Sequence, residues 1–462
     1  MNYVSSRGGA PILGFRDVLL AGLARDGGLY LPDAWPQLAP ETIAALAGRP
    51  YGEAARTVLA PFIGGEIDDE RLGAMIDEAY ATFRHAAVAP LVQLGPNDWV
   101  LELFHGPTLA FKDVAMQLLA RLMDHVLAER GERATIVGAT SGDTGGAAIE
   151  AFRGRARTDV FILFPRGKVS PVQQRQMTTA TDANVHAIAV DGNFDDCQAL
   201  VKAMFNDHGF RDRLRLAGVN SINWARIMAQ IVYYFTAAAS LGAPAREVSF
   251  TVPTGNFGDI FAGYAAKRMG LPVRRLVIAT NANDILARTL KTGRYEVTGV
   301  TATTSPSMDI QVSSNFERLV FEACGRDGAT VARLMAGLAQ SGAFTLPDTA
   351  LAAIRRDFAA GSADEADTAA TIARVLDESG YLADPHTAVG LDVARAFAGA
   401  EPMVTLATAH PAKFPDAVEA ASGTRPRLPA WLGDLMERRE RYETVANDAG
   451  AVKRHIEARA RM

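Results

Sequence analysis

One lysine stands where an apolar strand pattern gives way to a helix. In FHGPTLAFKD, residues 104–113, Lys112 begins a segment whose apolar residues recur at helical spacing. Such a junction lies at the edge of an α/β sheet, where ligands bind, and Phe111 would shield the amine from water. Because desolvation favours the neutral, nucleophilic amine, Lys112 could form a Schiff base with a carbonyl compound. The alternative is an ordinary first-turn lysine on a solvated face, but the rigid turn at 106–108 favours a loop that presents the amine.

Two further loops have the same strand, glycine turn and helix layout. One is SGDTGGAAIEAF, beginning at Ser141, and the other is TGNFGDIFAGYAAKR, beginning at Thr254. In each loop, glycines let backbone N–H groups approach an anion, and the following helix points its positive end at the same place. Many α/β proteins need such turns only for packing, so either loop alone is weak evidence. Neither loop matches GxxxxGK[ST] or GxGxxG, which argues against a nucleoside triphosphatase and a dinucleotide-binding enzyme.

These features together indicate a particular cofactor. A junction lysine, two anion loops and a strand end that carries Thr405, Thr408 and His410 would serve a molecule with an aldehyde, a phosphate and a ring nitrogen. The sequence therefore predicts pyridoxal phosphate.

The elements that must position these residues alternate between strand and helix from Trp99 onward. This alternation predicts an α/β fold with parallel strands joined by helical crossovers. We expect a helix-rich N-terminal domain at 1–92, a catalytic region of a large and a small α/β subdomain at 93–420, with a helical insertion at about 315–400, and a C-terminal helical tail at 421–462. The expected strands are 99–104, 134–140, 159–165, 184–192, 247–253, 273–281 and 403–409.

Composition narrows the function classes. The 462 residues carry a net charge of −5 with no basic stripe, which argues against a nucleic-acid partner. Cys197 and Cys324 are far apart, so neither a disulfide framework nor a metal site is expected. The most apolar stretch, 227–243, contains polar residues and is too short for a clear membrane span, so we expect a buried helix there. With no apolar signal core near the start, a cytoplasmic location is expected.

The chain also resembles a known family. The motifs are FHGPTLAFKD, ATSGDTGGAA, PRGKVSPVQQRQM, NSINWARIMAQIVYYF, PTGNFGD, DPHTAVG and TAHPAKFPDAV, in that order, within residues 5 to 420. They resemble those of threonine synthases, in the branch with a long N-terminal domain. The resemblance implies a pyridoxal-phosphate enzyme of the tryptophan-synthase β-like fold (fold type II). Such an enzyme is a carbon–oxygen lyase acting on phosphates that converts O-phospho-L-homoserine and water into L-threonine and phosphate by γ-elimination and β-addition of water, the last step of threonine biosynthesis.

The resemblance also implies roles for single residues. Lys112 would hold the cofactor covalently and then move protons at the Cα and Cβ of the substrate. Thr408 would place a hydroxyl, in place of a carboxylate, against the pyridine nitrogen and leave that nitrogen largely neutral. The residues that match the family's cofactor-phosphate loop are Gly255, Asn256, Phe257, Gly258 and Asp259.

Substrate groups would be bound by a second set of residues. Asp143 stands where many relatives with this fold carry Asn, and a carboxylate facing the substrate carboxylate leaves its role open. The leaving phosphate needs cationic donors. Arg226 is favoured because it lies in an apolar helix where an unpaired charge would be costly, and Arg166 is a further candidate. The expected substrate-binding residues are Ser141, Gly142, Asp143, Thr144, Lys168, Asn223 and Arg226.

Some alternatives stay open at the sequence level. The same lysine and phosphate loop would serve a phospho-lyase or dehydratase that releases 2-oxobutyrate, and a non-catalytic metabolite-binding protein could retain the fold. His386 and His410 are expected to be hydrogen-bonded core histidines more than catalytic ones. The subunit number is not given by the sequence; relatives suggest a monomer or a homodimer.

Overall fold

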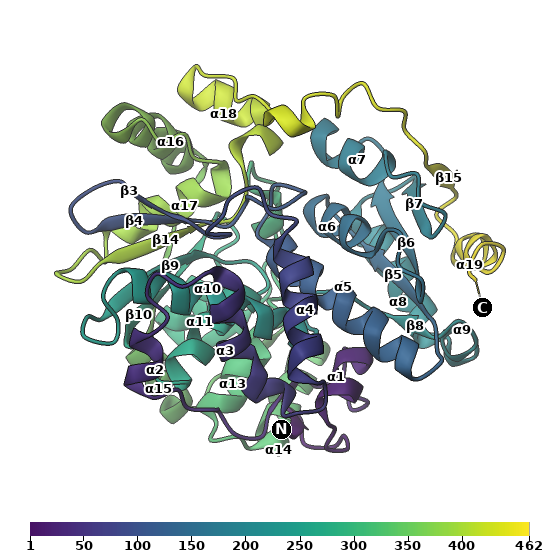
Figure 1. The fold of residues 1–462 in the computed structure, drawn as a ribbon, viewed down its shortest axis with the longest axis horizontal. Coiled ribbons are helices and arrows are strands. Elements are labelled where there is room, and N and C mark those ends of the chain that lie inside the picture. Colours follow the sequence, from purple (N-terminus) through teal and green to yellow (C-terminus); the bar gives the residue numbers. More distant parts are fainter. Residues whose placement is uncertain (462) are drawn as a thin grey trace.

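A six-stranded sheet forms the larger half of the molecule. The computed structural model describes residues 1–461, and Figure 1 shows this sheet together with a second one. The strand order is β13-β10-β9-β14-β4-β3, and every neighbouring pair is parallel except β3 with β4. The strands are β3 Leu91–Gln93, β4 Asp98–Glu102, β9 Val248–Pro253, β10 Val273–Thr280, β13 Phe358–Ser362 and β14 Met403–Ala407.

A five-stranded parallel sheet forms the smaller half. Its order is β15-β7-β6-β5-β8. All eight residues of its central strand β6 are buried, as expected for a strand that is covered by helices on both faces. The strands are β5 Ala134–Ala139, β6 Thr158–Pro165, β7 Val185–Val190, β8 Leu216–Ala217 and β15 Glu443–Val445.

Helices cover both faces of each sheet. On the smaller sheet, Val160 and Ile162 share a core with α6, whereas Phe161 and Leu163 contact α8, because successive side chains of a strand point to opposite faces. On the larger sheet, α10 and α11 cover one face and α17 the other. The helices are α5 Lys112–Glu129, α6 Asp143–Phe152, α7 Pro171–Thr178, α8 Phe194–Asn206, α9 His208–Leu214, α10 Trp224–Ser240, α11 Gly258–Arg268, α12 Ile285–Thr292, α13 Phe316–Ala323, α14 Gly328–Ser341, α15 Asp348–Asp357, α16 Glu365–Ser379, α17 Pro385–Arg395, α18 Pro415–Ser422 and α19 Ala449–Glu457.

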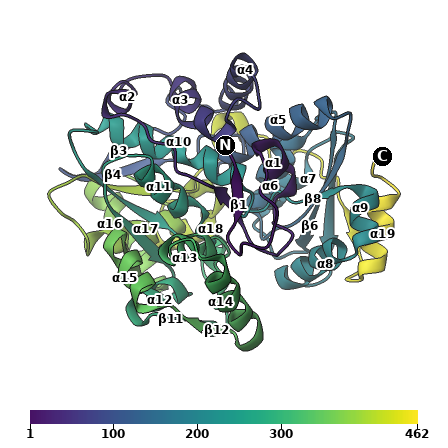
Figure 2. The same cartoon turned by 90° about the horizontal axis from the view of Figure 1, so that it is seen from below.

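The N-terminal segment packs on the helices between the sheets. Its helices α3 and α4 contact α10 and α5, and the view from below shows α2, α3 and α4 side by side along one edge (Figure 2). The same view shows α14 and the antiparallel strand pair of β11 and β12 projecting at the opposite edge. The elements are β1 Tyr3–Ser5, β2 Tyr30–Pro32, α1 Phe15–Ala21, α2 Pro40–Ala44, α3 Tyr51–Ile63, α4 Asp69–Tyr80, β11 Arg294–Glu296 and β12 Ala343–Thr345.

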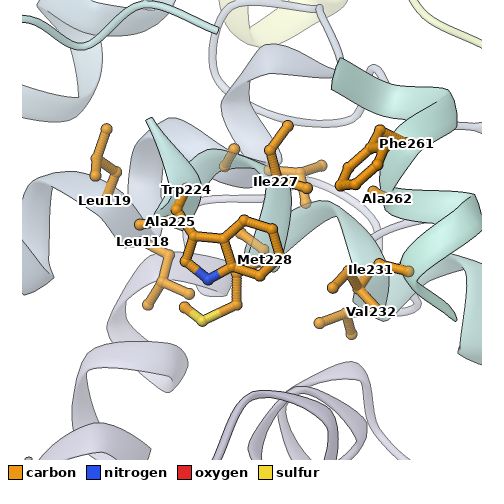
Figure 3. Close-up of a cluster of buried hydrophobic side chains, with 14 of the residues drawn as sticks. Leu118, Leu119, Trp224, Ala225, Ile227, Met228, Ile231, Val232, Phe261 and Ala262 are labelled. Carbon is orange, nitrogen blue, oxygen red and sulfur yellow. The ribbon is translucent and has the colours of Figure 1, made fainter. Parts of the chain in front are cut away.

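The largest core surrounds the first turns of α10. Trp224 is fully buried, and Figure 3 shows it beside Leu118 of α5, with Phe261 of α11 near Ile227. Its ring also contacts Tyr3 and Phe62, whose ring centroids lie 5.9 and 5.6 Å away. The N-terminal segment, α5, α10 and α11 therefore share one core. This core fixes the place of α10 relative to α5.

The structure confirms the parallel α/β fold and the seven strands expected within it, which correspond to β4, β5, β6, β7, β9, β10 and β14. The apolar stretch at 227–243 lies mostly in the buried helix α10. Among residues 1–461, no helix combines the length and the apolarity that spanning a membrane would require.

Two expectations about the C-terminal half need correction. The helical insertion at about 315–400 also contains the edge strand β13, which pairs with β10, and the tail at 421–462 contains β15, which pairs with β7. Both strands are short edge strands, with sequences FAAGS and ETV. Their strand conformation is fixed by pairing with a neighbour distant in sequence, which local propensity does not report.

Candidate active site

A cavity of about 260 Å³ lies where strands of the two sheets end. Loops after β4, β5, β9 and β14 surround it, at the carboxyl ends of the strands, as expected for a ligand site of a parallel sheet. Its lining includes ten of the residues expected at the site: Lys112, Asp143, Thr144, Arg226, Gly255, Asn256, Phe257, Gly258, Asp259 and Thr408.

Lys112 is the first residue of α5, and its amine points into this cavity. Nζ lies 3.1 Å from Asp143 Oδ2 and 3.4 Å from Ser307 Oγ. The Phe111 N–H donates to the Thr408 carbonyl at 2.8 Å, which ties the start of α5 to the end of β14. Burial lowers the pKa of the lysine, and the opposing effect of Asp143 does not restore it. The shielded amine expected from the sequence is therefore present.

Asp143 is an ion-pair centre buried behind the cavity. Its Oδ1 accepts hydrogen bonds from Lys413 Nζ at 2.7 Å and from Gln173 Nε2 at 2.9 Å. Burial acts to raise the pKa of Asp143, but Lys112 and Lys413 together hold it well below 3.8. Sequence reasoning missed Lys413, Gln173 and Ser307. Lys413 stands in the motif TAHPAKF, which marked the segment as important. The motif does not show, however, that the Lys413 side chain points toward Asp143.

The loop after β9 forms a backbone cradle. Phe257 has a φ of 64° and precedes α11, so the chain turns sharply at the helix start. A Cβ on Gly255 would lie 2.7 Å from the Ser307 carbonyl oxygen, so only glycine fits there. Within residues 1–461, the N–H groups of Gly255, Asn256 and Phe257 donate no backbone hydrogen bond. Free N–H groups at a helix N-terminus are suited to a phosphate.

Asp259 stabilises this turn from behind. The hydroxyls of Tyr233 and Tyr234, both on α10, donate to its Oδ1. Burial raises the pKa of Asp259 to about 6, although the two tyrosines act to lower it. Its contacts are thus with α10, and they hold the start of α11 in place.

The loop after β5 is held in a conformation that requires glycine. Gly142 has a φ of 142°, and a Cβ there would overlap the Gln173 side-chain amide. Thr140 Oγ1 accepts hydrogen bonds from the N–H groups of Gly142 and Gly145, both at 2.9 Å. Ser141 and Gly142 do not line the cavity themselves, whereas Asp143 and Thr144 do.

Arg226 brings a second cation into the cavity. It lies in the first turn of α10 and is 3% exposed. Its Nη1 donates to the Val219 carbonyl at 3.2 Å, while Nε is buried with no partner. Burial lowers the pKa of Arg226 to about 10. Within residues 1–461 no carboxylate pairs with it, so this guanidinium is available to an anion in the cavity.

Besides Ser141 and Gly142, two more of the expected substrate-binding residues do not line the cavity. Asn223 caps α10: its Oδ1 accepts from the Ala225 N–H at 3.0 Å, and its Nδ2 donates to the Leu19 carbonyl at 2.9 Å. Lys168 is exposed. Arg166, the further candidate beside it, forms a surface ion pair with Asp191 at 3.2 Å.

His386 and His410 each form hydrogen bonds with neighbouring residues, as expected from the sequence. His386 Nδ1 lies 2.7 Å from Asp384 Oδ2, and its Nε2 accepts from the Ser307 N–H at 3.2 Å. His410 Nδ1 accepts from the Ala412 N–H at 3.1 Å, and burial lowers the pKa of His410 to about 4. His386 also lines the cavity, where it positions Ser307.

The residues present fit pyridoxal phosphate. A buried amine, a cradle of free N–H groups and the Thr408 hydroxyl line the same cavity, in keeping with one aldehyde, one phosphate and one ring nitrogen. Within the described residues, no cluster of three or more His, Cys, Asp or Glu side chains is arranged to hold a metal ion.

Fold and site together define a pyridoxal-phosphate enzyme, and a family model described as pyridoxal-phosphate dependent enzyme matches residues 85–409. Two more specific models match the two ends, threonine synthase N terminus at 2–80 and threonine synthase, C-terminal, at 387–456, the latter overlapping the first match. The chain belongs to the threonine synthase family.

Individual relatives agree with this assignment. A threonine synthase of Pseudomonas aeruginosa is 56% identical over 99% of this chain and 98% of its own length. An X-ray structure of PLP-bound threonine synthase from Brucella melitensis matches with a TM-score of 0.98 and 67% identity, over 100% of both chains. The threonine synthase structure from yeast matches with a TM-score of 0.93 and 40% identity, over 99% of this chain and 98% of the other.

Proposed function

We propose that this chain is a pyridoxal-phosphate-dependent threonine synthase that converts O-phospho-L-homoserine and water into L-threonine and phosphate. The full-length similarity to threonine synthases supports this proposal. The structural observation that carries it is the buried Lys112 amine, which shares one cavity with a phosphate cradle and the unmatched cation Arg226.

The residues of this chain take distinct parts in that reaction. When bound, pyridoxal phosphate supplies an electron sink that stabilises negative charge at carbon. Lys112, whose amine lies 3.1 Å from Asp143, would hold the cofactor and would carry protons to and from the substrate carbons. The loop at 254–259 would hold the cofactor phosphate, and Thr408 would offer a hydroxyl to the ring nitrogen. A hydroxyl in place of a carboxylate would leave that nitrogen largely neutral.

The substrate is held by charge and by backbone N–H groups. Asp143 and Thr144 are the part of the loop at 141–144 that lines the cavity, and this part would receive the α-carboxylate. Lys413 neutralises the charge of Asp143. Arg226 binds a phosphate group and stabilises the charge that develops as it leaves. Lys168 would contribute only if its exposed loop moved toward the cavity, so it ranks after Arg226.

The cavity walls limit access of water. Phe111, Ile222, Phe257 and Met308 line it, so apolar side chains would shield a reacting carbon from early protonation.

One incubation tests the proposed reaction. Purified protein with pyridoxal phosphate and O-phospho-L-homoserine should give phosphate and threonine in equal amounts, with little 2-oxobutyrate. The Lys112→Ala variant should make neither product, while the exposed-lysine variant Lys291→Ala should match the parent protein. Phosphate with 2-oxobutyrate would identify a phospho-lyase or dehydratase that releases the oxo acid, and no product would favour a non-catalytic binding protein.

The division into domains at residues 92 and 420, the cytoplasmic location and the choice between monomer and homodimer stay predictions. Size-exclusion chromatography with light scattering would decide the subunit number.

A further inference from the structure

A second lysine is buried next to Lys112. Lys413 closes the short 3₁₀ helix η2, Pro411–Lys413, and its side chain is completely buried. Its Nζ donates to Asp143 Oδ1 and to the Thr108 carbonyl oxygen, each at 2.7 Å. Because Lys112 contacts Oδ2 of the same carboxylate, two ammonium groups share one buried anion.

The two lysines are not equivalent. Lys413 makes two short contacts, to a carboxylate and to a carbonyl, whereas Lys112 has one contact of 3.1 Å to the carboxylate and one of 3.4 Å to a hydroxyl. Shorter hydrogen bonds from a charged donor are the stronger ones. A buried group of two cations and one anion carries an unbalanced charge, which is costly. The proton that leaves should therefore come from Lys112.

We propose that Lys413 is a positioning residue of the active site: as the permanent counterion of Asp143, it leaves Lys112 as the neutral amine that binds the cofactor. This inference rests on the proposed role of Lys112. It also accounts for a carboxylate at position 143, in a loop that should receive the carboxylate of the substrate. Lys413 cancels the charge of Asp143, so the two carboxylates need not repel each other strongly.

Other charged groups near Lys112 either also favour its neutral form or are already bound by other partners. The cation of Arg226, from α10, also lowers the pKa of Lys112. Asp259, from the start of α11, is bound by two tyrosine hydroxyls, and its pKa is raised to about 6. Asp113, the next residue of α5, accepts from the Thr108 N–H at 2.7 Å and from its hydroxyl at 2.6 Å. Lys413 is thus the cation that binds the same carboxylate as Lys112, that of Asp143.

The test is a pH titration of the visible absorption band of the cofactor bound to Lys112, in the intact holoenzyme without substrate. In Lys413→Met the midpoint should rise by about 1–3 pH units, because a nearby positive charge is lost. In the double variant Lys413→Met with Asp143→Asn, which removes both charges, the midpoint should return to within about 1 pH unit of the parent value. The exposed-lysine variant Lys291→Met should leave the midpoint unchanged.

Two outcomes would overturn the inference: an unchanged midpoint in folded Lys413→Met, or a double variant that keeps the raised midpoint. If Lys413→Met does not fold, Asp143→Asn and the double variant are compared. The midpoint must then be higher in the double variant, and equal midpoints refute the inference. No turnover is measured, so a protein that acts on a different substrate would give the same titration. Failure of this proposal is therefore distinguishable from failure of the proposed reaction.

Discussion

Two buried arginines in this protein should respond to the same substitution with opposite signs. The Arg226 side chain makes one hydrogen bond, of 3.2 Å, and keeps a buried Nε without a partner. Arg318 is also fully buried, but it donates to the carbonyl oxygens of Tyr30 and Ile222 and to the side chain of Asn315. We predict that Arg226→Met stabilises the cofactor-free chain, whereas Arg318→Met destabilises it.

The magnitude follows from the burial of each charge. Burial lowers the pKa of Arg226 from 12.5 to about 10, which costs the folded state about 3 kcal/mol at 1.36 kcal/mol per pH unit. Arg226→Met removes part of this cost and should therefore raise the free energy of unfolding by about 1–3 kcal/mol. Burial also lowers the pKa of Arg318, to about 9. Its removal, however, leaves three acceptors without this donor, two of them in buried hydrogen bonds. Each buried acceptor left unpaired costs about 1–3 kcal/mol, so the net effect should be a loss.

The assay is urea unfolding of the cofactor-free variants, with and without inorganic phosphate. In the parent chain phosphate should raise the midpoint, because a bound ligand stabilises the folded state. Arg226→Met should have a higher midpoint without phosphate and bind phosphate about 10- to 100-fold more weakly, as expected for a lost charged hydrogen bond. If Arg226→Met were destabilised like Arg318→Met, or bound phosphate as tightly as the parent, the conclusion that Arg226 is a cation without a counterion would be refuted.

Three further substitutions have defined outcomes. Trp224→Ala should lower the free energy of unfolding by about 3–5 kcal/mol in urea titrations, since it empties the centre of the main core; a loss below about 1 kcal/mol would contradict that packing. Gly142→Ala should reduce kcat/KM by about 100-fold or more by displacing Gln173, while Gly337→Ala, with its nearest neighbour 3.5 Å away, should keep parent kinetics. For Asp259 the folded pKa of about 6 exceeds the ordinary aspartate value of 3.8, so its stabilising contribution is complete below pH 3.8 and is lost as pH rises through 6. Measured against Asp259→Asn, the parent should lose about 3 kcal/mol of unfolding free energy across that interval, and a flat difference would exclude the raised pKa.

Local patterns in the sequence determined much of the fold. The sequence predicted seven strands of the two main sheets because each is an apolar run bounded by turn residues, and such runs are set by short stretches of chain. The position of Lys112 at the start of α5 and the glycine turns before α6 and α11 were also evident, since a glycine turn is a local requirement. The motifs in their order indicated the family.

Only the tertiary structure decided which side chains meet. Lys413 reaches Asp143, and Asn223 turns away from the cavity to bond the Leu19 carbonyl, although both lie in family-like motifs. Arg226 was expected to need an anion, but only the structure shows that no carboxylate of residues 1–461 supplies it. The edge strands β13 and β15 likewise depend on distant partners.

The physical reason is the range of the forces involved. Helix and strand formation follow a side-chain period and turn chemistry that can be read over ten or twenty residues. Where a buried charged side chain points, by contrast, depends on the balance between the cost of desolvation and the partners that other parts of the chain supply. For Lys112 the sequence determined that an amine would be held at a strand-to-helix junction. The folded chain decided that Asp143 and Lys413 would control its charge.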